Sequence, residues 1–137
     1  MLSRRLLRGG YTVDGMNVPP RSVLIVDDDK DIRDALTEVL ADEGFLVKSA
    51  TNGQEATEWL RTNAGTTRVI LLDLMMPVMD GSTFLSLRES DPVLSSIPVV
   101  VMTAHGNVKP SSRPDVGAWI SKPIDLDRLI SAIHSFL

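Results

Sequence analysis

Residues 23–29 read VLIVDDD, a short apolar run that stops abruptly at three aspartates. The first four residues are largely β-branched and include no polar side chain, which is typical of a strand buried on both faces. Such strands occur almost only in parallel sheets that helices cover on both sides. The stretch therefore predicts an α/β fold and sets carboxylates at the carboxyl end of a buried strand.

Working outward from this stretch, apolar strand-like runs alternate with amphipathic segments along the chain. The further predicted strands are Phe45–Ala50, Val69–Leu72, Ile97–Met102 and Ala118–Ser121. The predicted helices are one through Ile32 and Leu40 ending near Gly44, then Gln54–Thr62, Ser82–Glu89 and Asp125–Leu137, with a turn at Asn52-Gly53 and an N-cap at Asp125. This alternation predicts parallel βαβ units with right-handed crossovers, and hence a doubly wound five-stranded sheet.

Composition limits the possible function classes. The 137 residues carry a net charge of -4, which argues against a nucleic-acid binder. The absence of cysteine excludes disulfides and thiolate sites, and fits a cytoplasmic location. No apolar run approaches the roughly 20 residues of a membrane span. We expect one domain over residues 22–137 behind a flexible, arginine-bearing tail over residues 1–21, within which Met16 is a candidate native start.

Four of the five predicted strands end at residues of the types that a single chemistry needs. Asp27 and Asp28 come after the first strand, Asp73 after the third, Thr103 after the fourth and Lys122 after the fifth. Ligand sites of doubly wound sheets lie outside the carboxyl ends of the strands, so these side chains are expected on one rim. A single Asp, Thr or Lys at such a position is ordinarily a cap or a solvated loop residue. Their coincidence on one rim is what indicates a site.

Three carboxylates at one rim would repel one another and raise their pKa values unless a cation compensates them. Mg²⁺ prefers oxygen ligands and retains several waters, so it suits a shallow acidic site. The lysine and the hydroxyl add donors for an anion. Together these groups predict a phosphoryl-transfer site in which Asp73 attacks phosphorus and becomes an acyl phosphate. The acidic residues Asp29, Asp31 and Asp34 are interpreted as a solvated helix start.

Four sequence blocks resemble the receiver domain of bacterial two-component response regulators. The blocks are VLIVDDD at 23–29, LLDLMMPVMDG at 71–81, VVVMTA at 99–104 and SKPI at 121–124. They occur in the order that the family has, and the resemblance runs from Ser22 to Leu137. It implies a flavodoxin-like (CheY-like) fold with strand order 2-1-3-4-5. It also implies a signalling protein rather than a conventional enzyme, one that catalyses its own phosphorylation and dephosphorylation.

The resemblance assigns roles to the acidic rim. Asp73 is expected to be the phosphoacceptor, Asp28 a direct metal ligand, and Asp27 a partner that acts mainly through water. Met75 is expected to give its backbone carbonyl to the metal. The implied cofactor is Mg²⁺, with Mn²⁺ as an alternative. The implied phosphoryl donor is a sensor histidine kinase or a phosphotransfer protein. Direct nucleic-acid binding and membrane attachment are not expected, and the expected oligomeric state is a monomer or a weak homodimer.

The same resemblance assigns a switch to the other strand ends. Thr103 and Lys122 would bind the phosphoryl group, and the Lys122-Pro123 bond is expected to be cis. Trp119 occupies the aromatic switch position, where Tyr or Phe is more usual, so its indole is expected to move inward less easily. The side chains of Met75 and His105 occupy the two positions that tune phosphoryl lifetime in this family.

The segment between Thr103 and Lys122 departs from the family pattern. Its 18 residues include Pro110 and Pro114, and a proline in a helix interior costs about 3 kcal/mol. The fourth helix of the fold, which reports phosphorylation to partners in this family, is therefore expected to be short, irregular or absent. We expect the chain to be a stand-alone receiver or a piece of a longer regulator, and its downstream partner is not encoded in the acceptor site.

Three other interpretations compete with this one. An EF-hand would place Asp27, Asp29, Asp31 and Glu38 at calcium-loop positions, but Ile32 stands where that loop needs glycine. A haloacid-dehalogenase-type phosphatase would need an acid two residues after the nucleophile, and Met75 is there instead. A receiver-like binding module that is not phosphorylated is disfavoured by the complete set of acceptor, metal, Thr and Lys residues.

Overall fold

The computed structural model describes residues 11–13, 16–18, 22–76, 78–104 and 116–136. Their elements in chain order are β1 (Tyr11–Val13), β2 (Met16–Val18), β3 (Ser22–Val26), α1 (Lys30–Asp42), β4 (Leu46–Ala50), α2 (Gly53–Asn63), the 3-10 turn η1 (Ala64–Thr66), β5 (Thr67–Asp73), α3 (Gly81–Ser90), α4 (Pro92–Ser95), β6 (Val99–Thr103), β7 (Ala118–Ser121) and α5 (Leu126–His134). No helix in these ranges is both long and apolar enough to cross a membrane.

Five parallel strands form the central sheet in the order β4-β3-β5-β6-β7. This is the predicted order 2-1-3-4-5 of a doubly wound, flavodoxin-like sheet, with the predicted polar-containing strand β4 at one edge. The register aligns the strand ends, because Val26 lies opposite Leu72 and Asp73 lies opposite Met102. Residues that follow β3, β5 and β6 therefore emerge at one rim.

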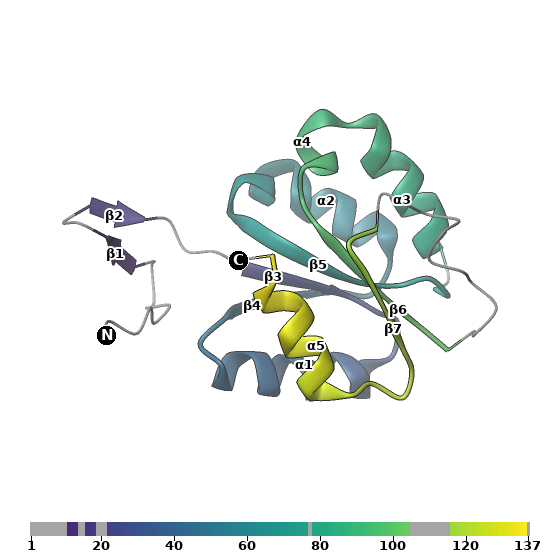
Figure 1. Cartoon of the computed structure of the whole chain (residues 1–137). Coiled ribbons are helices and arrows are strands. Elements are labelled where there is room, and N and C mark those ends of the chain that lie inside the picture. Colours follow the sequence, from purple (N-terminus) through teal and green to yellow (C-terminus); the bar gives the residue numbers. More distant parts are fainter. Residues whose placement is uncertain (1–10, 14–15, 19–21, 77, 105–115, 137) are drawn as a thin grey trace.

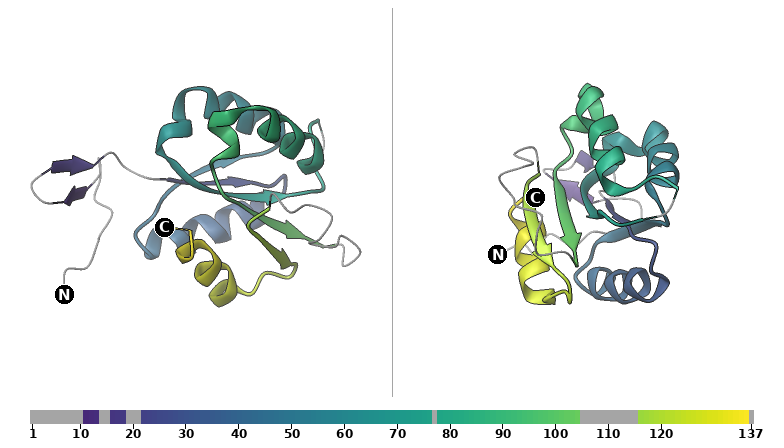
Figure 2. Two further views of the ribbon diagram at one scale, coloured as in Figure 1. Left: turned by 45° about the horizontal axis from the view of Figure 1, so that its top comes forward. Right: turned by 90° about the vertical axis from the view of Figure 1, so that its right-hand side faces the viewer.

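Helices cover both faces of this sheet. Figures 1 and 2 show α1 and α5 against one face, with α2, α3 and α4 against the other. The alternation of side chains along β3 divides the core accordingly. Leu24 and Val26 pack with the α2, α3 and α4 side, whereas Val23 and Ile25 pack with the α1 and α5 side. Burial on both faces explains why β3 is apolar at four successive positions.

Side-chain caps set where the main helices begin. Asp29, Asn52, Asp80 and Asp125 each accept a backbone N–H from the first turn of the helix that follows. The N-cap predicted at Asp125 is thus confirmed. At the other end of α1, Gly44 adopts a φ of 93°, in the left-handed region that favours glycine, and ends the helix where the sequence predicted.

The turn predicted at Asn52-Gly53 was wrong. Asn52 is the N-cap of α2 and Gly53 is its first residue. The glycine is required by packing, since a Cβ there would lie 2.8 Å from Cγ of Met79. Three boundaries differ from prediction by two residues or more: β5 begins at Thr67, β6 begins at Val99, and α5 ends at His134.

The short elements β1, β2, η1 and α4 were not predicted. β1 and β2 pair antiparallel with each other within residues assigned to a tail, and Figure 1 shows them beside the five-stranded sheet and outside it. The four-residue helix α4 follows α3 directly. The predicted irregularity of the fourth family helix concerns residues 105–115, which lie outside the described residues, and the flexibility of residues 1–21 stays a prediction.

Candidate functional site

Three carboxylates converge at the carboxyl ends of the two central strands. Asp27 and Asp28 follow β3, and Asp73 ends the neighbouring strand β5. One oxygen from each lies within 4.8 Å of the other two. Asp27 is fully buried and Asp73 is only 4% exposed, whereas Asp28 faces solvent. The predicted acidic rim therefore exists, with an entrance at Asp28.

Lys122 reaches this cluster from the end of β7. Its Nζ lies 3.0 Å from Oδ2 of Asp27 and 3.4 Å from Oδ2 of Asp73, so one ammonium serves two buried carboxylates. Its backbone N–H donates to the carbonyl of Thr103 at 2.8 Å, which fixes the start of the side chain at the rim. The Lys122-Pro123 bond is cis, as the resemblance implied.

The pKa of the Asp73 carboxyl is raised above its ordinary value. Burial is the main cause, and the negative charge of Asp27 adds to it. A hydrogen bond from the Met75 backbone N–H to Oδ1, 3.0 Å long, and the nearby Lys122 act in the opposite direction. Burial also opposes the charge of Lys122, but Asp27 and Asp73 outweigh it, so the pKa of this lysine is raised and it stays protonated at neutral pH.

Asp27 is held at three points. Its Oδ1 accepts the backbone N–H of Asp29 at 2.9 Å, its Oδ2 accepts from Lys122, and its carbonyl accepts from Nη1 of Arg33 at 2.9 Å. Arg33 was missed by the sequence patterns. Its signal was only its place one turn into α1, on the side that faces the end of β3.

The loop between β5 and α3 closes tightly under Asp73. The backbone N–H of Gly81 donates to the carbonyl of Leu74 at 2.9 Å. A Cβ at Gly81 would lie 2.6 Å from both the Asp73 carbonyl oxygen and the Leu74 Cα. Within the same loop Val78 has a φ of 68°, an uncommon value for a β-branched residue. Gly81, the first residue of α3, therefore allows close packing beneath the acceptor.

The two predicted switch residues lie on neighbouring strands. Thr103 is 5% exposed at the end of β6, one position beyond the residue opposite Asp73. Trp119 lies on β7 and packs its half-buried indole against the core on the α2 and α3 side. Its Nε1 is buried without a hydrogen-bond partner in the part of the chain that the structure describes. His105 lies outside the described residues.

The donor set fits a small divalent cation. Three carboxylates, two of them buried beside a single ammonium, supply oxygen ligands and excess negative charge, which are what Mg²⁺ requires. An EF-hand does not fit, because Asp29 is the N-cap of α1 and Asp31 lies in its first turn, so these residues belong to a helix rather than to a calcium loop.

The model of one protein family matches residues 23–134, and its description is response regulator receiver domain. This chain belongs to that family. A solved receiver domain described as CheY-like, from Methanospirillum hungatei, is 32% identical with a TM-score of 0.73, and the match covers 84% of this chain and 93% of that one. The receiver fold and the sequence blocks thus agree with the geometry of the rim.

Curated relatives are similar over the same region. The response regulator Rre1 of Synechocystis is 34% identical over 86% of this chain, and the phosphoglycerate transport system transcriptional regulatory protein PgtA of Salmonella typhimurium is 34% identical over 85%. The match covers 52% of the first relative and 28% of the second. This receiver chain therefore spans about half or less of the length of these two relatives.

Proposed function

We propose that this receiver domain is the phosphoacceptor of a two-component phosphorelay and that Asp73 carries the phosphoryl group. The observation that carries the proposal is the sharing of Lys122 between two buried carboxylates, 3.0 and 3.4 Å away. A structural ion pair needs one carboxylate for one ammonium. A third carboxylate, Asp28, lies beside them, so the site carries more negative charge than Lys122 compensates. This excess charge supports a metal-dependent reaction.

The reaction is a phosphoryl transfer between nitrogen and oxygen. An Oδ atom of Asp73 attacks the phosphorus of a phosphohistidine on a histidine kinase or phosphotransfer protein, the P–N bond breaks, and the imidazole retains its electron pair. Met75 N–H holds Oδ1 of Asp73 at 3.0 Å and orients the carboxylate. Lys122 then pairs with the phosphoryl oxygens, and Thr103 is positioned at the same rim to donate a hydrogen bond to them.

A magnesium ion held by Asp28, Asp73, the Met75 carbonyl and, through water, Asp27 would neutralise charge that develops on the phosphoryl oxygens. Mn²⁺ has the same ligand preference. Burial raises the pKa of Asp73, and a bound cation would lower it and so favour the ionised, nucleophilic carboxylate. Phosphorylation would reach a downstream partner through Thr103 and Trp119, and hydrolysis of the acyl phosphate would reset the domain.

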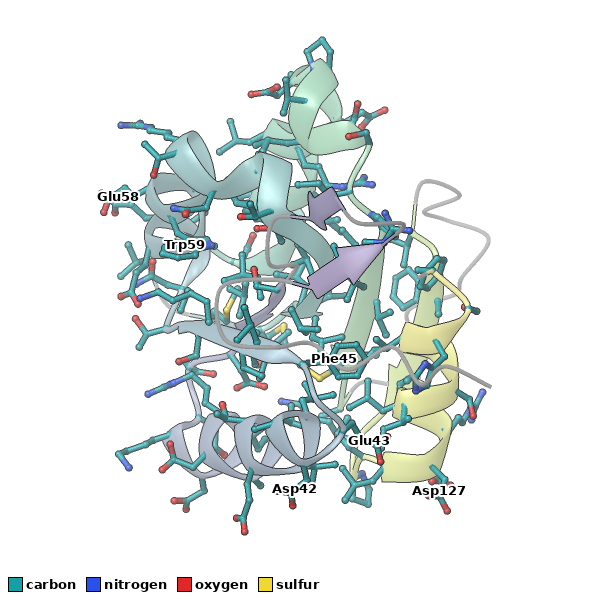
Figure 3. All side chains as sticks on the ribbon, turned by 90° about the vertical axis from the view of Figure 1, so that its left-hand side faces the viewer. Asp42, Glu43, Phe45, Glu58, Trp59 and Asp127 are labelled. Carbon is teal, nitrogen blue, oxygen red and sulfur yellow. The ribbon has the colours of Figure 1, made fainter. Side chains whose placement is uncertain are left out.

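The test is phosphorylation by a small donor. The chain is incubated with acetyl phosphate and Mg²⁺, and its intact mass is measured. One phosphoryl group is expected on the parent protein, and none on Asp73→Asn or in the presence of a chelator. Asp42→Asn is a matched control, since Asp42 lies on the outer side of α1 at its carboxyl end, away from the rim (Figure 3). Labelling that persists in Asp73→Asn would sink the assignment.

The wider setting is proposed from the charge of the chain and from its relatives. The net charge of -4 supports a protein partner rather than direct nucleic-acid binding by this chain, and a cytoplasmic location agrees with the absence of cysteine. Both relatives named above are longer proteins, so a DNA-binding segment in a longer form of this chain is a separate question. We expect a monomer or weak homodimer before phosphorylation, which sedimentation would measure.

A further inference from the structure

A pocket lies at the amino ends of β5 and β6, at the opposite end of the sheet from the acidic rim. Its volume is ≈ 360 Å³, within the range of small-ligand sites. Its walls include Ala64, Gly65, Arg68, Ile97, Pro98 and Phe136. Arg68 stands five residues before Asp73 on β5, which is about 17 Å along a strand. The Arg68 pocket is therefore separate from the phosphoacceptor site.

Arg68 is the only charged side chain among the described residues that line this pocket. Its Nε is buried, and it has no hydrogen-bond partner in the portion of the chain that the structure describes. A buried N–H that has lost its water and gained no acceptor is costly, and native proteins rarely leave one. Arg68 thus brings a positive charge to the pocket wall, and its buried Nε stays an unpaired donor among the described residues.

The neighbouring arginine shows why Arg68 does not find an acceptor in the adjacent backbone. Arg88 is buried, and its Nε and Nη2 both donate to the carbonyl of Ile97, at 3.1 and 2.7 Å. Its Nη2 also donates to the carbonyl of Ser95 at 3.1 Å. Both lone pairs of the Ile97 carbonyl are therefore in use. The carbonyl of Pro98 accepts the N–H of Ile70 at 3.0 Å. These two carbonyls therefore already serve other donors.

Part of the wall of the Arg68 pocket is apolar. Ile97 and Pro98 contribute aliphatic surface, and the ring of Phe136 contributes an aromatic wall. That ring packs directly on the backbone at Gly117, where a Cβ would lie 2.5 Å from its Cζ. A ligand that pairs with the guanidinium would therefore lie against apolar groups that are already in place.

We propose that the Arg68 pocket binds a carboxylate that is attached to a flat apolar body. A guanidinium offers a planar fork of N–H groups that matches the two oxygens of a carboxylate. The apolar body would lie against Phe136 and Pro98. The same chemistry is carried by a small aromatic acid and by the free carboxyl terminus of a peptide that ends in an aromatic residue.

The test uses NMR titration of the whole chain with benzoate in the absence of Mg²⁺ and of any phosphoryl donor. Saturable shifts are expected at the Arg68 Nε–H and at the amides of residues 65–68 and 117. Benzamide, which has the same shape without the charge, should bind at least tenfold more weakly. N-acetylphenylalanine represents the peptide terminus, and saturation by it but not by benzoate would assign the pocket to a peptide terminus rather than to a free acid.

Variants separate this site from general anion attraction. Arg68→Gln should weaken benzoate at least tenfold, while Arg61→Gln, which removes an exposed charge on α2, should change it less than twofold. Where Arg68→Gln lowers folding, Arg68→Lys keeps the charge without the fork and should still weaken binding several-fold. Asp73→Asn should bind benzoate like the parent, so this result does not depend on phosphorylation. Equal binding of benzoate and benzamide, or saturation of Arg68 by inorganic phosphate alone, would overturn the proposal.

Discussion

A methyl group added at Gly81 tests the packing beneath the phosphoacceptor. In Gly81→Ala the new Cβ would lie 2.6 Å from the carbonyl oxygen of Asp73 and 2.6 Å from the Cα of Leu74. Both are backbone atoms and cannot rotate away as a side chain would. Carbon contacts are optimal at about 3.5–4.0 Å, so the loop between β5 and α3 has to move by roughly 1 Å.

Three effects set the size of the destabilisation. Overpacking costs about 1–3 kcal/mol. Movement of the Gly81 N–H away from the Leu74 carbonyl, now 2.9 Å apart, costs about 1 kcal/mol more. The higher helix propensity of alanine than of glycine stabilises the folded state by about 1 kcal/mol in the opposite direction. The net loss is about 1–3 kcal/mol, or a fall in Tm of roughly 3–12 °C for a domain of this size.

Thermal unfolding and phosphorylation should be measured together on Gly81→Ala and on Gly65→Ala. Gly65 is the matched control, because a Cβ there would meet no atom within 4 Å. Its replacement should be neutral or slightly stabilising. A shift of about 1 Å at Asp73 should slow acetyl phosphate labelling of Gly81→Ala by about 10²-fold, since reacting groups tolerate little misplacement. If Gly81→Ala unfolds and labels like the parent, the close packing under Asp73 is refuted.

Three further predictions concern the same rim. Asp73→Asn should raise Tm at pH 7, because the pKa of Asp73 in the folded protein is raised above its ordinary value. The ionised carboxylate of Asp73 therefore lowers the stability of the parent as the pH rises through that folded-state pKa. The higher Tm of Asp73→Asn should disappear below about pH 4, the ordinary range of an Asp, where the carboxyl is protonated in both states. Thermal unfolding between pH 3 and 8 measures this, and a pH-independent difference would contradict it. Val78→Gly should stabilise the domain by about 0.5–1 kcal/mol in urea unfolding, because a φ of 68° strains a β-branched residue whose side chain is 78% exposed and packs on little. Met75→Asn should shorten the lifetime of the acyl phosphate several-fold. The Met75 side chain is 60% exposed beside Asp73, and an amide admits water where a thioether excludes it. A hydrolysis rate that is unchanged after removal of the donor would count against shielding of the acyl phosphate by Met75.

The acidic rim could be predicted because parallel-sheet geometry converts sequence position into spatial position. Once 23–26 and 69–72 are taken as neighbouring buried strands, the residues that follow them have to meet. Asp27, Asp73 and Lys122 were placed together on this ground, and the structure brings them within 3.0 and 3.4 Å of the shared ammonium. The ion pairs themselves were not predictable, because they depend on rotamers and on the register of β7.

Local signals failed where tertiary contact or a competing signal decided the outcome. Asn52-Gly53 is a good turn dipeptide, yet contact with Met79 makes Gly53 a packed helix residue. The helix α4 has a start signal in the sequence, since Asp91 accepts two backbone N–H groups and Pro92 follows at the first helical position. Its four residues are too few to show a helical repeat of apolar side chains, which is the pattern used to predict helices. Asp14-Gly15 between β1 and β2 is a hairpin signal that the arginine-rich composition outweighed.

One ammonium shared between two carboxylates has a consequence for signalling. On the proposed chemistry, a phosphoryl group on Asp73 brings close to two negative charges to the rim, and Lys122 pairs with it at the expense of Asp27. The backbone of Lys122 ties this lysine to the sheet, because its N–H is bonded to the carbonyl of Thr103 and it directly follows β7. Trp119 lies three residues earlier on that strand, with an unpaired indole N–H among the described residues. On the proposed chemistry, β7 is therefore the strand that links the charge at Asp73 to Trp119.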